Sequence, residues 1–279
     1  MQILMLLFTY VTLASSWNLL AGYAGQVSLG NAAFFGASGF TMLILLQMGV
    51  ESVYSMLIGV AVAVLFALLM IPLFRLRGAY FAIGTLFFAL ALQHFYTYRQ
   101  SYLYEPLILY VPLPKSFTSE VYYIAAFLLA YASVMTVYLI SKSRLYYALR
   151  AIRDDEDIAE EIGINTFVCK IIVLLVVALF TGAAGAIYIH FVGRGYPPDL
   201  FSLEWSGYPL VMCVLGGVGS LIGPIIGALL FLLLSELLTG LVGALSLLLW
   251  SIILIAVIHF FPSGIYGILK RIWVRRGGL

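Results

Sequence analysis

The chain has 279 residues, of which 64% are hydrophobic and only 9% are charged, and its formal net charge is +2. Soluble domains carry roughly 25% charged residues, so this composition excludes an ordinary water-soluble fold. A spanning helix needs about 20 apolar residues, which allows about nine transmembrane helices, with a range of about eight to ten. We therefore expect one all-α polytopic membrane domain over residues 1–279.

Apolar runs between polar or Gly/Pro breaks predict nine spans. In chain order they lie near residues 2–20, 31–48, 53–74, 79–98, 120–140, 168–191, 205–217, 221–239 and 243–261. The run at 205–217 is short and contains Pro209, so we expect either a full crossing or a broken, re-entrant half-helix. If all nine runs cross, the two termini lie on opposite sides of the membrane.

Lys and Arg residues gather in alternate predicted loops, and this bias orients the chain in the membrane. With a cytoplasmic C-terminus, the inner segments carry ten basic residues and the outer segments carry three. The inner set is Arg75, Arg77, Lys142, Arg144, Arg150, Arg153, Lys270, Arg271, Arg275 and Arg276, and the outer set is Arg99, Lys115 and Arg194. The positive-inside rule therefore places residues 141–167 and the C-terminus in the cytoplasm.

Catalytic and redox signatures are missing from the sequence. It contains no H-E-x-x-H motif, no G-x-S-x-G motif and no phosphate-binding G-x-x-x-x-G-K-[ST] loop. The centres of the predicted helices lack Asp, Glu, Lys and Arg, which disfavours a proton-coupled carrier. Cys169 and Cys213 lie in apolar runs, where we interpret them as small buried hydrophobic residues. We expect a protein that is not an enzyme and that binds no metal and no nucleic acid.

The segment at residues 22–36 combines helix-breaking glycines with neutral polar groups at membrane depth. Unwound backbone in a membrane has to line a cavity or be buried in protein. The hydrogen-bonding side chains are Gln26, Ser28 and Asn31, and two aromatic residues, Phe34 and Phe35, follow one turn later. These residues indicate either a substrate pathway or a polar clasp between helices, and on their own they do not choose between the two.

A second glycine-rich stretch, residues 216–227, leads into a hydrophobic helix in the other half of the chain. Together with residues 22–39 it suggests an inverted repeat with broken helices, an arrangement common in membrane transporters. Gly219, Gly223 and Gly227 recur at intervals of four residues. This spacing predicts that they share one helix face and allow a neighbouring helix to approach closely.

Residues 142–165 form the longest polar stretch and hold six of the twelve acidic residues. Leu145, Leu149 and Ile152 fall on one helical face, and Asp154 is placed to cap a second short helix that ends at Gly163. A charge-rich helical loop is either simply solvated or a docking surface for a partner. Both interpretations stay open on these residues.

Five motifs in order along the chain carry a family resemblance. They are GYAGQVSLGNAAFFGA at residues 22–37, LRGAYFAI at 76–83, ALRAIRDDE at 148–156, EIGIN at 161–165 and LGGVGSLIGPIIGA at 215–228. Over about residues 16–240, the sequence resembles the M-type permease of branched-chain amino-acid ABC importers. Asn31 departs from the family pattern, because many relatives carry His there, and a permease for urea or short amides is therefore an alternative.

The resemblance implies a transport subunit in the plasma (inner) membrane of a prokaryote, surrounded by lipid. Such a subunit forms the translocation path for branched-chain or related hydrophobic amino acids and pairs with a homologous H-type permease. It further implies two ATP-binding subunits that bind ATP and Mg, and an extracytoplasmic solute-binding protein, while this chain itself binds no cofactor. A self-sufficient secondary transporter or channel is the alternative from another class.

The resemblance also assigns a role to the polar loop at residues 141–167. This loop matches the segment through which the family contacts its ATPase subunits. The matching positions are Arg150, Arg153, Glu160, Glu161 and Gly163. The resemblance therefore favours the docking interpretation over a simply solvated loop.

Overall fold

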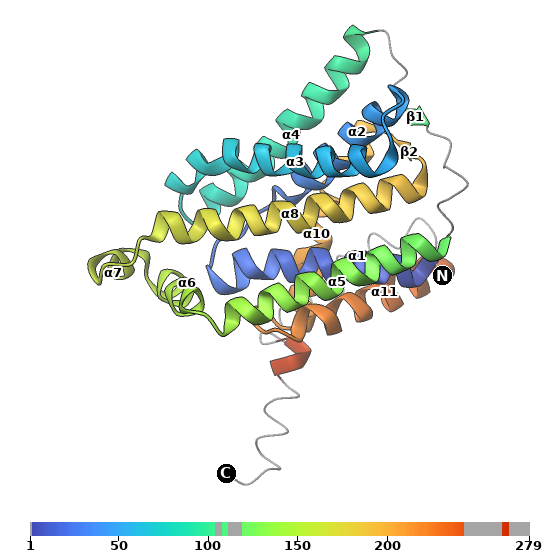
Figure 1. The fold of residues 1–279 in the computed structure, drawn as a ribbon. Helices are drawn as coiled ribbons and strands as arrows, with labels where there is room; N and C mark the ends of the chain where they lie inside the picture. Colours follow the sequence, from blue (N-terminus) through green and yellow to red (C-terminus); the bar gives the residue numbers. More distant parts are fainter. Residues whose placement is uncertain (1, 104–107, 111–118, 243–263, 268–279) are drawn as a thin grey trace.

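The computed structural model of the chain describes residues 2–103, 108–110, 119–242 and 264–267. In chain order these form α1 (Gln2–Asn18), the π-helical turn η1 (Leu19–Tyr23), α2 (Asn31–Gln47), α3 (Ser52–Met70), the 3-10 turn η2 (Ile71–Arg75), α4 (Ala79–Tyr102), β1 (Leu109–Tyr110), α5 (Ser119–Ser141), α6 (Arg144–Asp154), α7 (Glu156–Glu161), α8 (Thr166–Val192), β2 (Arg194–Gly195), α9 (Pro197–Leu200), α10 (Glu204–Gly216) and α11 (Gly223–Val242). The long helices form a bundle with α6 and α7 at one end, called here the α6 end (Figure 1). The antiparallel pair β1–β2 lies at the opposite, strand end.

Five helices in the described ranges are long and apolar enough to cross a membrane: Gln2–Tyr23, Ser52–Arg75, Ala79–Tyr102, Glu120–Ser141 and Thr166–Val192. They match five of the predicted spans and support an all-α membrane fold. Two further apolar helices, Asn31–Gln47 and Gly223–Leu238, are shorter, and α10 has only 13 residues with Pro209 inside it. The predicted span at 243–261 lies outside the described residues, so the count of nine crossings stays a prediction.

Helix α2 packs against both α3 and α8 through small residues. A Cβ on Gly59 of α3 would lie 2.5 Å from the carbonyl oxygen of Ser38, and one on Gly185 of α8 would lie 2.3 Å from that of Phe35. Any larger side chain at these positions would push the helices apart. Glycines therefore bring three backbones together, as close packing between membrane helices requires.

Glycines also pack α11 against α10. A Cβ on Gly227 would lie 1.8 Å from the carbonyl oxygen of Met212, and one on Gly216 of α10 would lie 1.8 Å from that of Gly223. The predicted three-glycine face is wrong for Gly219, which lies in the preceding loop with φ +78°. The physical reason is that Ser220 accepts a hydrogen bond from the Gly223 amide at 2.9 Å, and α11 begins at Gly223. The suggested inverted repeat stays a prediction.

Helices α6 and α7 form a short arm at the α6 end. Leu149 and Ile152 are buried against the bundle, as the apolar stripe predicted. The capping residue of α7 is Asp155 and not the predicted Asp154, which is still the last residue of α6. The Asp155 carboxylate accepts hydrogen bonds from the amides of Asp157 and Ile158, at 2.9 and 3.1 Å. Gly163, with φ +89°, follows the end of α7 as expected.

Six of the ten basic residues predicted to share the inner side of the membrane are described, and they lie at the α6 end: Arg75, Arg77, Lys142, Arg144, Arg150 and Arg153. The other four, Lys270, Arg271, Arg275 and Arg276, lie outside the described residues. Arg77, in the connection after η2, forms a salt bridge with Asp157 of the arm. Arg194 lies in β2 at the opposite end (Figure 1). The structure thus groups these loops as the charge pattern predicted, whereas the assignment of the α6 end to the cytoplasm stays a prediction.

Candidate functional site

The first helical stretch of the chain breaks at the α6 end and restarts as α2. Its last turn is the π-helical η1, and residues 24–30 are non-helical until α2 begins at Asn31. Gly25 lies in this segment with φ +71°, a conformation that glycine adopts without steric cost. A π-turn followed by unwound backbone among apolar helices is an arrangement often found at functional sites.

Side chains from three helices hold the unwound segment in place. Trp17 of α1 donates its indole N–H to the carbonyl oxygen of Ser28 at 2.9 Å. The hydroxyl of Thr85 in α4 accepts the Leu29 amide N–H at 3.0 Å. The hydroxyl of Ser206 in α10 accepts the Ala32 amide N–H at 2.9 Å. Protein groups therefore satisfy much of this backbone, as membrane depth requires.

Asn31 differs from the other polar residues of this segment. It is 0% exposed, and neither Oδ1 nor Nδ2 has a hydrogen-bond partner in the described part of the chain. An unpaired buried polar group costs about 1–3 kcal/mol. Ser28, by contrast, accepts the Gly30 amide at 3.1 Å, and Gln26 is buried beside it. Asn31 is therefore the strongest candidate in this segment for a group that pairs with a solute.

Phe34 and Phe35, in the first turn of α2, are both fully buried. The Phe35 ring stacks on Trp205 of α10, with 3.9 Å between ring centroids and 18° between planes. It also packs against Tyr188 of α8 at 5.9 Å. The structure thus joins the predicted pathway segment to an aromatic cluster, Phe35, Tyr188 and Trp205, against which an apolar side chain can pack.

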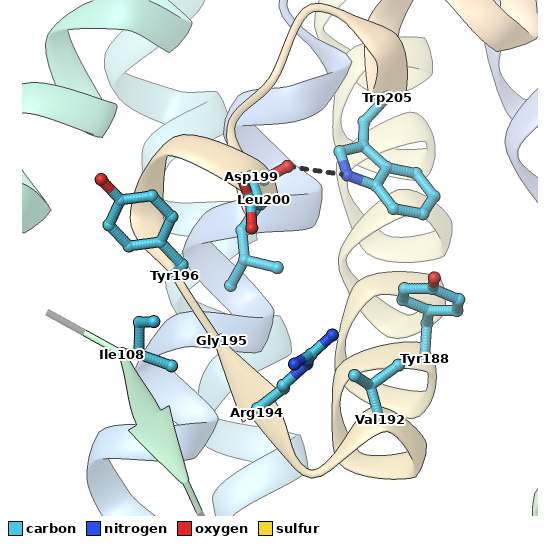
Figure 2. Close-up of a pocket in the computed structure, with 9 residues that line it drawn as sticks. All are labelled: Ile108, Tyr188, Val192, Arg194, Gly195, Tyr196, Asp199, Leu200 and Trp205. Carbon is cyan, nitrogen blue, oxygen red and sulfur yellow. Dashed lines mark hydrogen bonds between the residues drawn. The ribbon is translucent and has the colours of Figure 1, made fainter. Parts of the chain in front are cut away.

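A pocket of about 280 Å³ lies beside this aromatic cluster at the strand end. Its walls come from the last turns of α8, from β2, from α9 and from the start of α10 (Figure 2). The lining residues are Ile108, Tyr188, Val192, Arg194, Gly195, Tyr196, Asp199, Leu200 and Trp205. The Trp205 indole N–H donates to the carbonyl oxygen of Asp199 at 3.1 Å, which holds this ring between the pocket and Phe35.

At the α6 end, Arg153 of the arm reaches both glycine-rich breaks. Its Nη1 donates to the carbonyl oxygen of Gly22 at 2.5 Å, and a Cβ on Gly219 would lie 2.8 Å from the same nitrogen. The fully buried Asn18 joins the two breaks as well: its Nδ2 donates to the Ser220 carbonyl at 2.8 Å, and its Oδ1 accepts from the Gly219 amide at 2.7 Å. The two breaks and the predicted coupling loop therefore meet at one place.

The remaining predicted coupling residues lie on the outer part of the arm. Arg150 and Glu161 are exposed, and no atom lies within 4 Å of the Cβ position on Gly163. Glu160 contacts the bundle, because its Oε1 accepts a hydrogen bond from the hydroxyl of Thr166, the first residue of α8, at 2.5 Å. All five predicted coupling residues are exposed. Arg153 and Glu160 also contact the bundle, whereas Arg150, Glu161 and Gly163 lie only at the surface of the arm.

Two ion pairs fix the arm to its neighbours. Buried Lys170 of α8 pairs with Glu156 at the start of α7. Arg77 donates to both carboxylate oxygens of Asp157 at 2.9 and 2.7 Å. The hydrogen bonds and the charge of Arg77 hold the pKa of the Asp157 carboxyl below its usual range. Because these two side chains are 60% and 66% exposed, water and salt screen this pair, which positions the arm more than it stabilises it.

Sequence reasoning missed Asn18, Thr85, Tyr188, Trp205 and Ser206. These polar and aromatic residues come from four different helices, α1, α4, α8 and α10, and only the fold brings them to the broken segment. Trp205 and Ser206 alone carried a local signal, because they begin the short run that was marked as a candidate half-helix.

Comparison with known proteins gives a consistent set of relatives. The family described as "Branched-chain amino acid transport system / permease component" matches residues 1–260. The high-affinity branched-chain amino acid transport system permease proteins LivM of Escherichia coli (strain K12) and Salmonella typhimurium (strain LT2) are each 25% identical over 260 residues. The alignments cover 82% of this chain and 61% of each relative, so the chain spans about three fifths of their length. No solved structure matches the chain.

The family match covers helices α1 to α11, which include both glycine-rich breaks and the arm. It confirms the resemblance that five sequence motifs indicated. It also agrees with five helices that are long and apolar enough to cross a membrane. The chain therefore belongs to the family of branched-chain amino acid transport system permease components, which are membrane-embedded transport proteins.

Proposed function

We propose that the chain is the transmembrane permease subunit of an ATP-driven ABC importer for branched-chain or related hydrophobic amino acids. The observation that carries the proposal is the fully buried, unpaired amide of Asn31 at the start of α2. Family membership supports the class of transporter, and the names of the LivM relatives support the class of solute.

The surroundings of Asn31 suit an amino acid in transit. A zwitterion that enters the membrane loses water around its carboxylate and its ammonium, which is costly unless polar groups replace that water. The Asn31 amide offers both an acceptor and donors, and the first turn of α2 adds the positive end of a helix dipole. Neutral groups of this kind bind an ion weakly enough to release it. The cluster of Phe35, Tyr188 and Trp205 suits the apolar side chain.

The partners follow from the same proposal. A homologous H-type permease completes the membrane part, two ATP-binding subunits hydrolyse Mg-ATP at the α6 end, and an extracytoplasmic solute-binding protein delivers the solute at the strand end. Arg150, Glu161 and Gly163 contact the ATPase subunits from the surface of the arm. This orientation places α6, α7 and the C-terminus in the cytoplasm of a prokaryotic cell.

Uptake by proteoliposomes that hold the complete complex tests the proposal. Asn31→Leu removes the amide at similar volume and is expected to lower ATP-dependent leucine uptake several-fold, with assembly and basal ATPase activity nearly intact. Gln26→Ala is expected to act in the same direction. Ser38→Ala is the matched control: its hydroxyl is also buried and unpaired on α2, but it lies against Gly59 of α3.

The outcomes separate the alternatives. Wild-type uptake rates in both Asn31→Leu and Gln26→Ala would mean that these groups form a structural clasp and that the path runs elsewhere. Uptake of labelled urea without uptake of leucine would select the short-amide permease. Leucine uptake that needs no ATP would select a self-sufficient secondary transporter or channel.

A further inference from the structure

The pocket at the strand end contains two charged side chains of opposite sign. Of its nine lining residues, only Arg194 and Asp199 are charged. Figure 2 shows the Arg194 side chain extending from β2 into the space between α8 and the segment that carries Asp199. Within the described ranges, neither side chain forms a hydrogen bond or an ion pair within 4.0 Å. The two charges therefore share a pocket without neutralising each other.

The fold fixes the backbone of both residues. Pairing of β1 with β2 sets Arg194 opposite Tyr110. In α9, the Asp199 amide donates to the Tyr196 carbonyl at 3.0 Å, and the Asp199 carbonyl accepts from Trp205 at 3.1 Å. Both side chains are exposed, so the fixed backbone brings two accessible charges of opposite sign to one pocket.

Apolar side chains form the rest of the wall. The rings of Tyr188 and Trp205 meet at 5.0 Å and 63°, and Leu200 and Val192 lie nearby in the same pocket. The volume of about 280 Å³ is just below that of most ligand pockets, which span roughly 300–1,000 Å³. This size suits a single small metabolite with one apolar part.

We propose that this pocket is a receiving site for a zwitterionic amino acid with an apolar side chain. The Arg194 guanidinium pairs with the α-carboxylate, for which its planar donor geometry is well suited. The Asp199 carboxylate pairs with the α-ammonium group, and Tyr188 and Trp205 pack against the side chain. The assignment rests on the proposed function, since it names the place where that importer takes its solute.

One aromatic layer lies between the pocket and the helix that begins at Asn31. Trp205 lines the pocket and stacks on Phe35 at 3.9 Å, and Phe35 lies one turn after Asn31 on α2. A solute that leaves the pocket passes this stack to reach Asn31. In this order, the outer site with Arg194 and Asp199 selects the zwitterion by charge. The neutral amide of Asn31 at the inner site then binds the solute weakly enough to release it.

Ligand-observed NMR tests the receiving site, because it detects weak binding. The sample is the purified complex of both permeases and the ATP-binding subunits, without the solute-binding protein. Leucine is compared with leucinamide, which lacks the carboxylate, and with 4-methylpentanoate, which lacks the ammonium group. The wild-type complex is expected to prefer leucine several-fold over both analogues. Arg194→Gln should lose only the preference over leucinamide, and Asp199→Asn should lose only the preference over 4-methylpentanoate. A merely structural role for these residues would not produce this complementary pattern.

Two further variants serve as controls. Arg194→Lys keeps the positive charge and should retain most of the preference over leucinamide. Glu51→Gln removes a carboxylate from the residue before α3, outside the pocket, and should change neither preference. Gel filtration of each variant complex confirms that it assembles.

The failures of the two proposals are distinguishable. If both pocket variants keep both preferences while the wild-type complex imports leucine with ATP, the receiving site is wrong and the proposed function stands. If the variants keep both preferences but bind the solute-binding protein more weakly, the two charges form a docking surface for that protein, and the receiving site is again wrong. A wild-type complex that imports no leucine would overturn the proposed function itself.

Discussion

Asn18 and Asn31 are both fully buried amides beside the same unwound segment, but their hydrogen bonding differs. Asn18 uses Oδ1 and Nδ2 to hold the loop before α11, whereas both polar atoms of Asn31 are unpaired in the described part of the chain. A paired buried amide stabilises a fold, and an unpaired one costs about 1–3 kcal/mol. Asn18 therefore fastens α1 to the loop before α11, whereas the choice between a solute path and a polar clasp for Gln26, Ser28 and Asn31 stays a prediction.

Gly185 shows how tightly the aromatic cluster depends on backbone contact between helices. A Cβ at this position would lie 2.3 Å from the carbonyl oxygen of Phe35 and 2.9 Å from its Cα. Main-chain atoms cannot move aside as the end of a side chain can. We expect Gly185→Ala to destabilise the fold by about 1–3 kcal/mol and to shift Phe35 from Trp205. Scanning fluorimetry should show a lower unfolding temperature, and leucine uptake should fall.

Gly207 provides the matched control on α10. Nothing lies within 4 Å of its Cβ position, and alanine is favoured over glycine in a helix by about 1 kcal/mol. Gly207→Ala should therefore keep or raise the unfolding temperature. Equal unfolding temperatures for the two variants would contradict the close α2–α8 contact.

At the scale of elements, the arm of α6 and α7 connects the ATPase side of the proposed complex to both breaks. Arg153 contacts the carbonyl oxygen of Gly22 and lies against Gly219. Gly25 and Gly219, one in each break, have positive φ angles of +71° and +78°. Glycine changes between such conformations at little steric cost. A movement of α6 can therefore reach both breaks through one guanidinium.

The Arg153 contact predicts a separation of coupling from assembly. Arg153→Gln removes the charge-assisted hydrogen bond to the Gly22 carbonyl. Solute-stimulated ATPase activity and uptake should fall several-fold, while basal ATPase activity and assembly persist. Arg144→Gln is the control, because it removes the same charge from the exposed first turn of α6. Stimulated activity that survives Arg153→Gln, or that falls equally in both variants, would rule out this link.

Local composition made the long helices predictable, because a spanning helix is defined by a continuous apolar run. The unwound segment was equally visible, since its glycines and amides are adjacent in the sequence. The first residue of α11 was not visible in the sequence, because it depends on one hydrogen bond, from the Gly223 amide to the Ser220 hydroxyl. The pocket was not visible either: Tyr188, Arg194 and Asp199 form one site only after β2 pairs with β1 and α9 turns the chain back.

At the scale of the whole molecule, the two ends of the bundle have different chemistry. The arm of α6 and α7 lies at one end and β2 at the other (Figure 1). The arm is rich in charged residues, and β2 and α9 line the pocket with Arg194 and Asp199. Asn31 is buried between the two ends on α2, the short helix that packs between α3 and α8. This order matches an importer in which solute arrives at one end and nucleotide energy at the other.

The orientation in the membrane decides whether this order is correct, and the positive-inside bias predicts it. Single cysteines at Ser101, exposed near the end of α4, and at Ser143, before α6, report the two ends. They are placed in a background with Cys169→Ser and Cys213→Ala. In intact cells, a membrane-impermeant thiol reagent should label position 101, whereas position 143 should react only after permeabilisation. Labelling at 143 alone would place the pocket in the cytoplasm, where no extracytoplasmic binding protein can load it.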